Sequence, residues 1–168
     1  MVNMGGGFPI RYREDIPGID HFADVIFRTM TRCFGNALPE MLVEPGRYIV
    51  GEAGTVSSEV VLVSRRGREG GPRWVYLDIG RFGGLAETEG ESIRYQIGVD
   101  GRDGQMEQVY FAGPTCDGAD IMYEKSHYEM PNDLKAGDRV QIDGTGAYVS
   151  TYCSTRFNGF APLEEYYI

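Results

Sequence analysis

The stretch 19-IDHFADVIFRTMTRCF-34 decides the architecture of the N-terminal part of the chain. Its apolar residues recur at helical spacing, a Pro-Gly pair stands before it and Gly35 follows it, so the pattern predicts a helix of about four turns. Upstream, 2-VNM-4 begins like a strand and breaks into three glycines; downstream, 40-EMLVEPGRYIV-50 is mostly apolar. Strand, helix and strand in this order indicate a unit of a parallel α/β fold.

After about residue 52 the pattern changes to short β-rich runs separated by turn residues. The runs are SSEVVLVSRR (57–66), RWVYLDIG (73–80), SIRYQIGV (92–99), MEQVYFAG (106–113), DRVQIDGTGAYVS (138–150) and FAPLEEYYI (160–168). The turns between them include REGGP (68–72), DGRDG (100–104) and MPNDLKAGD (130–138). This spacing favours an all-β barrel or sandwich. We therefore expect an α+β chain with two parts, residues 1–52 and 53–168.

The composition argues against several classes of partner. A net charge of −9 is unfavourable for nucleic acid, because phosphate binding needs clustered lysine and arginine. No apolar run approaches the ~18 residues of a membrane span, and the N-terminus lacks the pattern of a signal peptide. Three cysteines, odd in number and far apart, fit reduced thiols in the cytoplasm.

Five short motifs are candidates for chemistry: 5-GGGFP-9, 44-EPGR-47, 113-GPTCD-117, 145-TGAYVS-150 and 157-FNGF-160. Glycines after a strand let backbone N–H groups approach an anion, and an arginine fork matches phosphate geometry. Each motif also has a structural interpretation: a flexible turn, a surface ion pair, a cysteine filling a turn, a packed tyrosine and a hairpin, respectively.

The order of these motifs resembles the ornithine decarboxylase group of fold type III, pyridoxal-phosphate-dependent amino-acid decarboxylases. That group is related to diaminopimelate decarboxylase and, in fold, to alanine racemase. The resemblance covers essentially the whole chain, and 76-YLDIGRFGGLAETEGESIRY-95 is especially similar to the bacterial enzymes. It implies that residues 1–52 are the last βαβ portion of a (β/α)8 barrel. Residues 53–168 would be the β domain that completes the site of the opposite subunit in a homodimer.

The resemblance implies that pyridoxal 5'-phosphate is the cofactor, and it implies no metal. The backbone of Gly5, Gly6 and Gly7 would donate to the cofactor phosphate, which Arg47 and Tyr148 would also bind. Glu44 would pair with the pyridine nitrogen and keep it protonated, so that the ring can take up electrons as CO₂ leaves.

The same resemblance implies a substrate site shared between subunits. Cys116 would reach across the dimer and assist protonation after decarboxylation, and Asp117 would receive the distal amine of a diamine substrate. Counting without gaps from the LDIG motif places a second substrate carboxylate at Glu91, although a shifted loop would let Glu87 or Glu89 take its role. The implied activity is ornithine decarboxylation to putrescine in polyamine biosynthesis, with lysine or a related diamino acid as the open alternative.

The chain departs from the family at the lysine that carries the cofactor. Its two lysines, Lys125 and Lys135, stand in polar, turn-like contexts without the family's Ala-Val-Lys motif, and His127 matches no ring-stacking histidine. A strand that the β domain borrows from the N-terminus of the full enzyme is also missing, so we expect an unpaired edge.

Two functions remain open from the sequence. In the first, the chain resembles roughly the C-terminal half of a decarboxylase, is inactive alone and needs a complementing N-terminal barrel segment. In the second, it is a non-catalytic truncated or regulatory β module of the same family.

Overall fold

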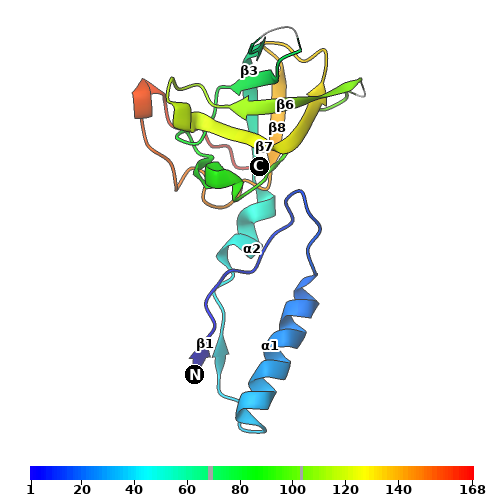
Figure 1. Cartoon of the computed structure of the whole chain (residues 1–168). Coiled ribbons are helices and arrows are strands. Elements are labelled where there is room, and N and C mark those ends of the chain that lie inside the picture. Colours follow the sequence, from blue (N-terminus) through cyan, green and yellow to red (C-terminus); the bar gives the residue numbers. More distant parts are fainter. Residues whose placement is uncertain (68–69, 103) are drawn as a thin grey trace.

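The computed structural model describes residues 1–67, 70–102 and 104–168. In Figure 1 an N-terminal arm, residues 1–50, projects from a body made of β-strands. The arm holds β1 (Val2–Asn3), α1 (Ile19–Phe34), β2 (Met41–Leu42) and α2 (Gly46–Val50). The helix predicted over 19–34 is confirmed at both ends, and β1 pairs with β2 in parallel, as the strand–helix–strand pattern indicated.

Two segments of the arm run side by side toward the body. Near its far end Val2 N donates to Glu40 O at 2.8 Å, and farther along Glu44 N donates to Gly5 O at 2.8 Å. The first segment then reaches the body at Tyr12, whose ring packs edge-on against a core tyrosine with 5.5 Å between centroids. This course brings the glycine loop and the EPGR turn together.

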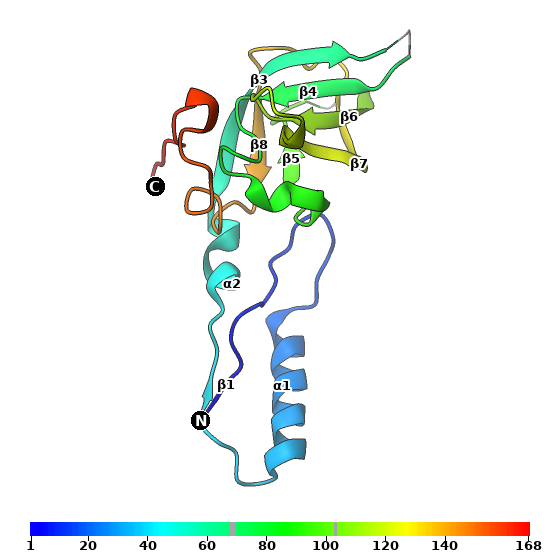
Figure 2. The same ribbon diagram turned by 60° about the vertical axis from the view of Figure 1, so that its left-hand side comes forward.

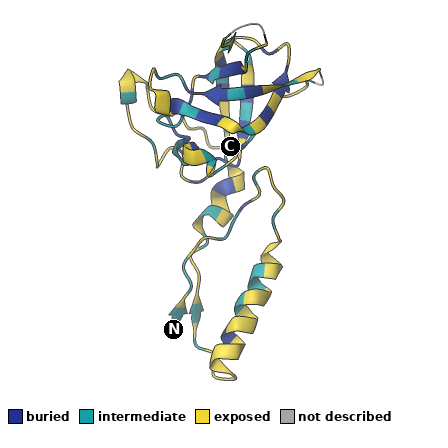
Figure 3. Ribbon diagram, viewed as in Figure 1, coloured by how far each residue is buried: buried dark blue, intermediate teal, exposed yellow. Residues whose placement is uncertain are grey.

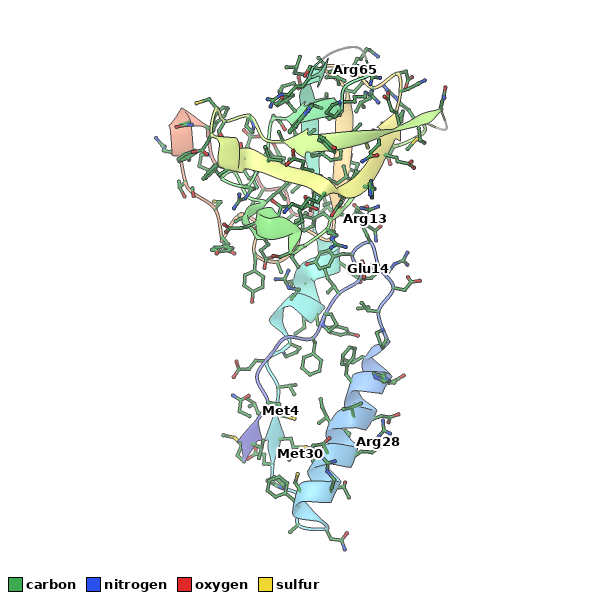
Figure 4. The ribbon with its side chains drawn as sticks, in the orientation of Figure 1. Met4, Arg13, Glu14, Arg28, Met30 and Arg65 are labelled. Atoms are coloured by element: carbon green, nitrogen blue, oxygen red, sulfur yellow. The ribbon has the colours of Figure 1, made fainter. Side chains whose placement is uncertain are left out.

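Most of α1 is open to solvent. Its buried residue is Met30, and Figure 3 colours nearly all of the helix as exposed. In Figure 4 Met30 lies on the side of α1 that faces the two strands. Two strands of two residues each offer a helix little surface to pack on. The arm and its junction with the body therefore expose large apolar side chains: Ile19, Val25, Phe27, Phe34, Leu38, Leu42, Val43, Tyr48, Ile49 and Val50.

A mixed six-stranded sheet forms the body (Figure 2). Its strands are β3 (Thr55–Arg65), β4 (Arg73–Leu77), β5 (Gln96–Gly98), β6 (Met106–Ala112), β7 (Ile121–Pro131) and β8 (Arg139–Asp143), in the order β5-β8-β3-β4-β6-β7. β4 and β6 are parallel, and the other neighbours are antiparallel. The first half of β3 pairs with β8 and the second half with β4, and the pairing with β4 shifts register between Val60 and Leu62. Such a bent strand turns a corner, and the sheet curls into a nearly closed barrel.

Tyrosine side chains close the gap between the two edge strands, β5 and β7. The Tyr123 hydroxyl donates to Ile93 O at 2.7 Å and accepts from Tyr95 N at 3.0 Å. The Tyr128 hydroxyl donates to Tyr95 O at 2.7 Å. These bonds join β7 to residues 93–95, just before β5, through side chains, and in the described residues neither edge strand has a backbone partner on its outer side.

One apolar core fills the barrel. Side chains from every strand of the sheet meet in it, and their burial is the main favourable contribution to folding. Its buried members are Val60, Val75, Leu77, Ile79, Leu85, Tyr95, Val109, Phe111, Met122, Tyr123, Tyr128, Met130, Leu134, Val140 and Ile142. Among the described residues, no helix is long and apolar enough to cross a bilayer.

The longest element that the sequence analysis does not predict is β7. The sequence does not indicate a strand over residues 121–131 and suggests turn-like surroundings for Lys125 and His127. In the structure both residues lie within β7. Between Tyr123 and Tyr128 the strand bulges, because these two residues pair with Phe111 and Val109, only two positions apart. The bulge breaks the alternation of period two on which strand prediction depends.

The C-terminal run was also interpreted wrongly. Residues 160–168 form no strand, and Pro162 within them has no N–H to donate to a ladder. Residues 144–150 continue past β8 as turns, and 157–159 form a 3₁₀ turn instead of a hairpin. The predicted turns at 68–72 and 100–104 fall partly outside the described residues, at 68–69 and 103.

Candidate functional site

The glycine loop and the EPGR turn pack directly on one another. A Cβ on Gly6 would lie 2.4 Å from Glu44 O, so only glycine fits there without a shift. Asn3 links the two motifs, since its Nδ2 donates to Glu44 Oε1 at 2.5 Å and its Oδ1 accepts from Gly5 N at 2.8 Å. The Gly5 N–H is thus engaged, and the backbone donors that the loop offers to an anion are those of Gly6 and Gly7.

Arg47 begins the next helix and is held on three sides. Its Nη1 donates to the Tyr12 hydroxyl at 2.6 Å, and its Nη2 donates to Glu87 Oε1 at 2.6 Å. The Tyr148 ring lies against the guanidinium, with 4.7 Å between Cζ and the ring centroid. The resemblance assigned Arg47 and Tyr148 to the cofactor phosphate. They are far apart in the chain, yet their side chains are in contact. Whether they bind phosphate stays a prediction.

Glu87 is the acidic partner that the sequence interpretation did not place at this arginine. The side chains of Arg47 and Glu87 are each 20% exposed, so the pair is largely removed from water. Glu87 Oε2 is buried and has no hydrogen-bond partner among the described residues. A partly buried carboxylate with one unsatisfied oxygen is unfavourable unless a strong cation stands beside it.

The pKa directions in this cluster follow from burial and charge. Burial opposes the charged guanidinium, but the hydrogen bond to Glu87 and the nearby Tyr12 outweigh it and raise the pKa of Arg47. Burial raises the pKa of the Tyr12 hydroxyl, against the opposing effect of Arg47. Arg47 therefore stays positively charged and Tyr12 stays protonated at neutral pH.

Cys116 and Asp117 lie on an exposed loop of the body. The Cys116 thiol is exposed, and its recorded neighbour is Asn158 Nδ2 at 3.9 Å, which brings the FNGF and GPTCD motifs together. Asp117 Oδ1 caps the following 3₁₀ turn by accepting from Ala119 N at 2.8 Å. Within the described residues, no recorded contact joins this loop to Arg47 or Glu44.

Asp120 anchors the loop that carries Cys116 and Asp117, and the sequence analysis did not single it out. Its side chain is 2% exposed, accepts from Thr115 N at 3.1 Å and Thr115 Oγ1 at 2.8 Å, and also accepts from Arg81 N at 2.8 Å. A Cβ on Gly80 or Gly113 would collide with it at 2.2 and 2.3 Å. A carboxylate three residues after Asp117, together with Gly80 and Gly113 just beyond the ends of β4 and β6, is the signal that could have identified this residue.

Glu91 has a different set of partners from the one expected. Its Oε1 accepts from Glu124 N at 2.9 Å and Lys125 N at 2.7 Å, and its Oε2 accepts from Ser126 N at 2.7 Å and from the Ser126 hydroxyl. These donors belong to the bulge of β7. In this structure the Glu91 carboxylate accepts the hydrogen bonds of the backbone N–H groups in the bulge. Its role toward a substrate stays a prediction. Of the neighbouring carboxylates, Glu87 binds Arg47 and Glu89 pairs with Arg81 at 3.0 Å.

We expect Glu91→Gln to destabilise the body at neutral pH and to lose that effect in acid. Burial opposes ionisation of Glu91, but hydrogen bonds from Ser126 and the backbone of 124–126 outweigh it and lower its pKa below 4.5. A lowered folded pKa adds stability above the unfolded pKa, and that stability disappears as the pH falls through the folded pKa. Urea unfolding of both proteins between about pH 7 and pH 3 measures this. A constant difference across the range would contradict it.

The residues thus form two groups. Gly5–Gly7, Glu44, Arg47 and Tyr148 lie along the arm and its junction with the body, and the Cys116–Asp117 loop lies on the body. No group of three or more His, Cys, Asp or Glu side chains in the described residues is arranged to hold a metal ion.

Comparison with known proteins identifies the family. The model of the pyridoxal-dependent decarboxylase C-terminal sheet domain matches residues 23–146. The chain belongs to the pyridoxal-dependent decarboxylases. It is 31% identical over 161 residues to the lysine/ornithine decarboxylase of Selenomonas ruminantium, covering 95% of this chain and 38% of that protein. It is 32% identical over 158 residues to a diaminopimelate decarboxylase of Staphylococcus aureus, covering 88% and 35%, so it spans less than half the length of these relatives.

Solved structures of decarboxylases share the fold. The lysine/ornithine decarboxylase of Vibrio vulnificus complexed with cadaverine has a TM-score of 0.79 at 32% identity, covering 95% of this chain and 42% of that one. Diaminopimelate decarboxylase of M. jannaschii in complex with L-lysine has a TM-score of 0.77 at 26% identity, covering 95% and 36%. Pyridoxal phosphate is the cofactor of the family. Another similar structure, of a protein abbreviated SrLDC, was solved in complex with pyridoxal phosphate and cadaverine.

The residues present fit the phosphate end of that cofactor. A permanently charged guanidinium next to a tyrosine ring and a glycine loop with backbone donors form an anion-binding set. Glu44 is exposed at the end of β2, where a carboxylate can meet a protonated ring nitrogen. The guanidinium is occupied by Glu87, so a phosphate there has to compete with a carboxylate.

Proposed function

We propose that this chain is the part of a pyridoxal-phosphate-dependent decarboxylase that binds the cofactor phosphate and selects a diamino acid, ornithine in the first place. The observation that carries the proposal is the contact of Arg47 with Tyr148, in a chain of this family whose Gly5–Gly7 loop packs on the turn just before Arg47. Because the relatives are more than twice as long, we propose that an N-terminal barrel segment completes the site. We call the two together the assembled enzyme.

Within the assembled enzyme, the arm would hold the cofactor. When bound, pyridoxal phosphate supplies an electron sink for the electron pair that remains as CO₂ leaves. Arg47, Tyr148 and the N–H groups of Gly6 and Gly7 would hold the phosphate. Glu44, oriented by Asn3, would keep a proton on the ring nitrogen. A carboxylate in that position favours the charged ring, because opposite charges at short range stabilise one another.

The Cys116–Asp117 loop would serve the site of a second copy of the chain. Both residues are exposed, and the loop has no recorded contact with Arg47 or Glu44 in the described residues. A homodimer that brings this loop to the partner's arm would give each site one thiol and one carboxylate. Cys116 would return a proton to the carbon that has lost CO₂, and Asp120 would keep the loop in position.

The substrate would be a small basic amino acid with a distal amine. Lysine/ornithine decarboxylases are among the relatives, and Asp117 offers a negative charge beside the proposed proton donor. An exposed carboxylate attracts a distal ammonium and repels a distal carboxylate, which favours ornithine or lysine over diaminopimelate. Decarboxylation of ornithine would yield putrescine, a step of polyamine biosynthesis.

Two substitutions test the proposed roles in the assembled enzyme. Glu44→Ala removes the partner of the ring nitrogen, and Cys116→Ala removes the proton donor; each should lower the rate of CO₂ release by about 10²–10³. Cys116→Ala should also increase wrongly protonated product, whereas Glu44→Ala should not. Cys33→Ala, an exposed cysteine at the end of α1, is the control and should keep full activity. Unchanged rates in both active-site variants would refute the proposal.

A further inference from the structure

Glu87 forms an ion pair with the arginine of the proposed phosphate site. Its Oε1 lies 2.6 Å from Arg47 Nη2, both side chains are 20% exposed, and its Oε2 is buried without a partner in the described residues. Glu87 comes from the 3₁₀ turn Ala86–Glu91 of the body, whereas Arg47 comes from the arm. The Glu87 carboxylate therefore binds the same guanidinium that we propose as the partner of the cofactor phosphate.

A phosphate and Glu87 cannot both bind Arg47 without cost. Two of the five guanidinium donors are used by Tyr12 and Glu87, and the Tyr148 ring covers part of the remaining surface. A phosphate brings nearly two negative charges, and like charges sharing one partly buried site repel strongly. Glu87 Oε2 increases the repulsion from a phosphate, because it is buried and no hydrogen-bond donor in the described residues compensates its charge.

We propose that Glu87 is a built-in competitor of the cofactor phosphate: it holds the Arg47 side chain in place before phosphate binds and leaves when phosphate binds. This inference rests on the proposed function, because it takes Arg47 as the phosphate partner. The internal ion pair lowers the apparent phosphate affinity by the fraction of molecules in which Arg47 is free. In exchange, the arginine is not left buried without a counterion before the cofactor arrives.

Titration calorimetry of the whole chain with pyridoxamine 5'-phosphate tests the competition. This probe carries the phosphate but has an amine in place of the aldehyde, so it cannot react with the two lysines. Glu87→Gln keeps the shape and removes the charge, and we expect its dissociation constant to fall by about tenfold relative to wild type. Glu87→Asp, which retracts the charge by one methylene, should give a smaller gain in the same direction and serves if Glu87→Gln does not fold.

The matched controls separate this inference from the proposed function. Glu89→Gln makes the same charge change on the same turn, but its side chain is 79% exposed and pairs with Arg81, so its affinity should equal that of wild type. Equal affinities of wild type, Glu87→Gln and Glu89→Gln, including no binding by any of them, would overturn the competition. If Glu87→Gln binds more tightly and Arg47→Met added to it leaves that affinity unchanged, Arg47 is not the phosphate partner and the proposed function fails instead.

Discussion

Norvaline should react about 10⁴-fold less efficiently than ornithine in the assembled enzyme. Norvaline has the same carbon chain and lacks only the distal amine. In the proposed dimer the Asp117 carboxylate would be enclosed by the partner's site, where a charge needs a counterion. A substrate without the amine would leave that carboxylate buried and unpaired, and such a penalty is the largest source of discrimination available to a binding site.

The ratio of kcat/KM for the two amino acids measures this, with Asp117→Ala as the decisive variant. Removing the carboxylate should lower the value for ornithine and raise that for norvaline, because no unpaired charge is then left behind, so that the ratio falls toward one. Turnover of lysine above that of ornithine would keep Asp117 in its role and change only the preferred chain length. Comparable turnover of norvaline and ornithine by wild type would defeat the proposed substrate class.

Arg73→Met should destabilise the body by about 3–5 kcal/mol. Arg73 on β4 is 4% exposed, and its guanidinium donates to the Pro131 and Leu134 carbonyls at 2.9 and 3.1 Å, with longer contacts to Met130 and Asn132. Hydrogen bonds from a charged donor are worth about 1.5–3 kcal/mol each. Methionine would leave the Leu134 carbonyl without this donor and the Pro131 carbonyl with the Leu134 N–H alone. The carbonyls belong to the end of β7 and the turn that leads to β8.

Urea unfolding followed by circular dichroism measures the loss, and Arg65→Met is the matched control. Arg73 also pairs with Glu107, at 3.8 Å. Arg65 lies opposite Arg73 in the β3–β4 pair and binds the same Glu107 at 2.6 Å, but half of its side chain is exposed. An exposed ion pair contributes about 0–1 kcal/mol, so the control should lose little stability. Similar losses in the two variants would show that Arg73 acts only through Glu107.

Local sequence was sufficient wherever one element decides its own conformation. The helix over 19–34 followed from its apolar period, and β3, β4, β6 and β8 followed from β-rich runs between turns. The same reading missed β7, because its bulge disturbs the period of two. It also extended a strand over the C-terminal residues, because β-rich composition alone does not show whether a segment pairs with the sheet.

The order of short motifs was enough to name the family and its cofactor, because each motif is a local arrangement of glycines, charges and one thiol. Only the tertiary structure decided which side chains meet. Glu87, Glu89 and Glu91 look interchangeable in the sequence, yet they contact Arg47, Arg81 and the β7 backbone, respectively. A kink at Glu89–Gly90 turns the three carboxylates in different directions, and each partner comes from a distant segment. The identity of a charged group is local, whereas its partner depends on how the whole chain packs.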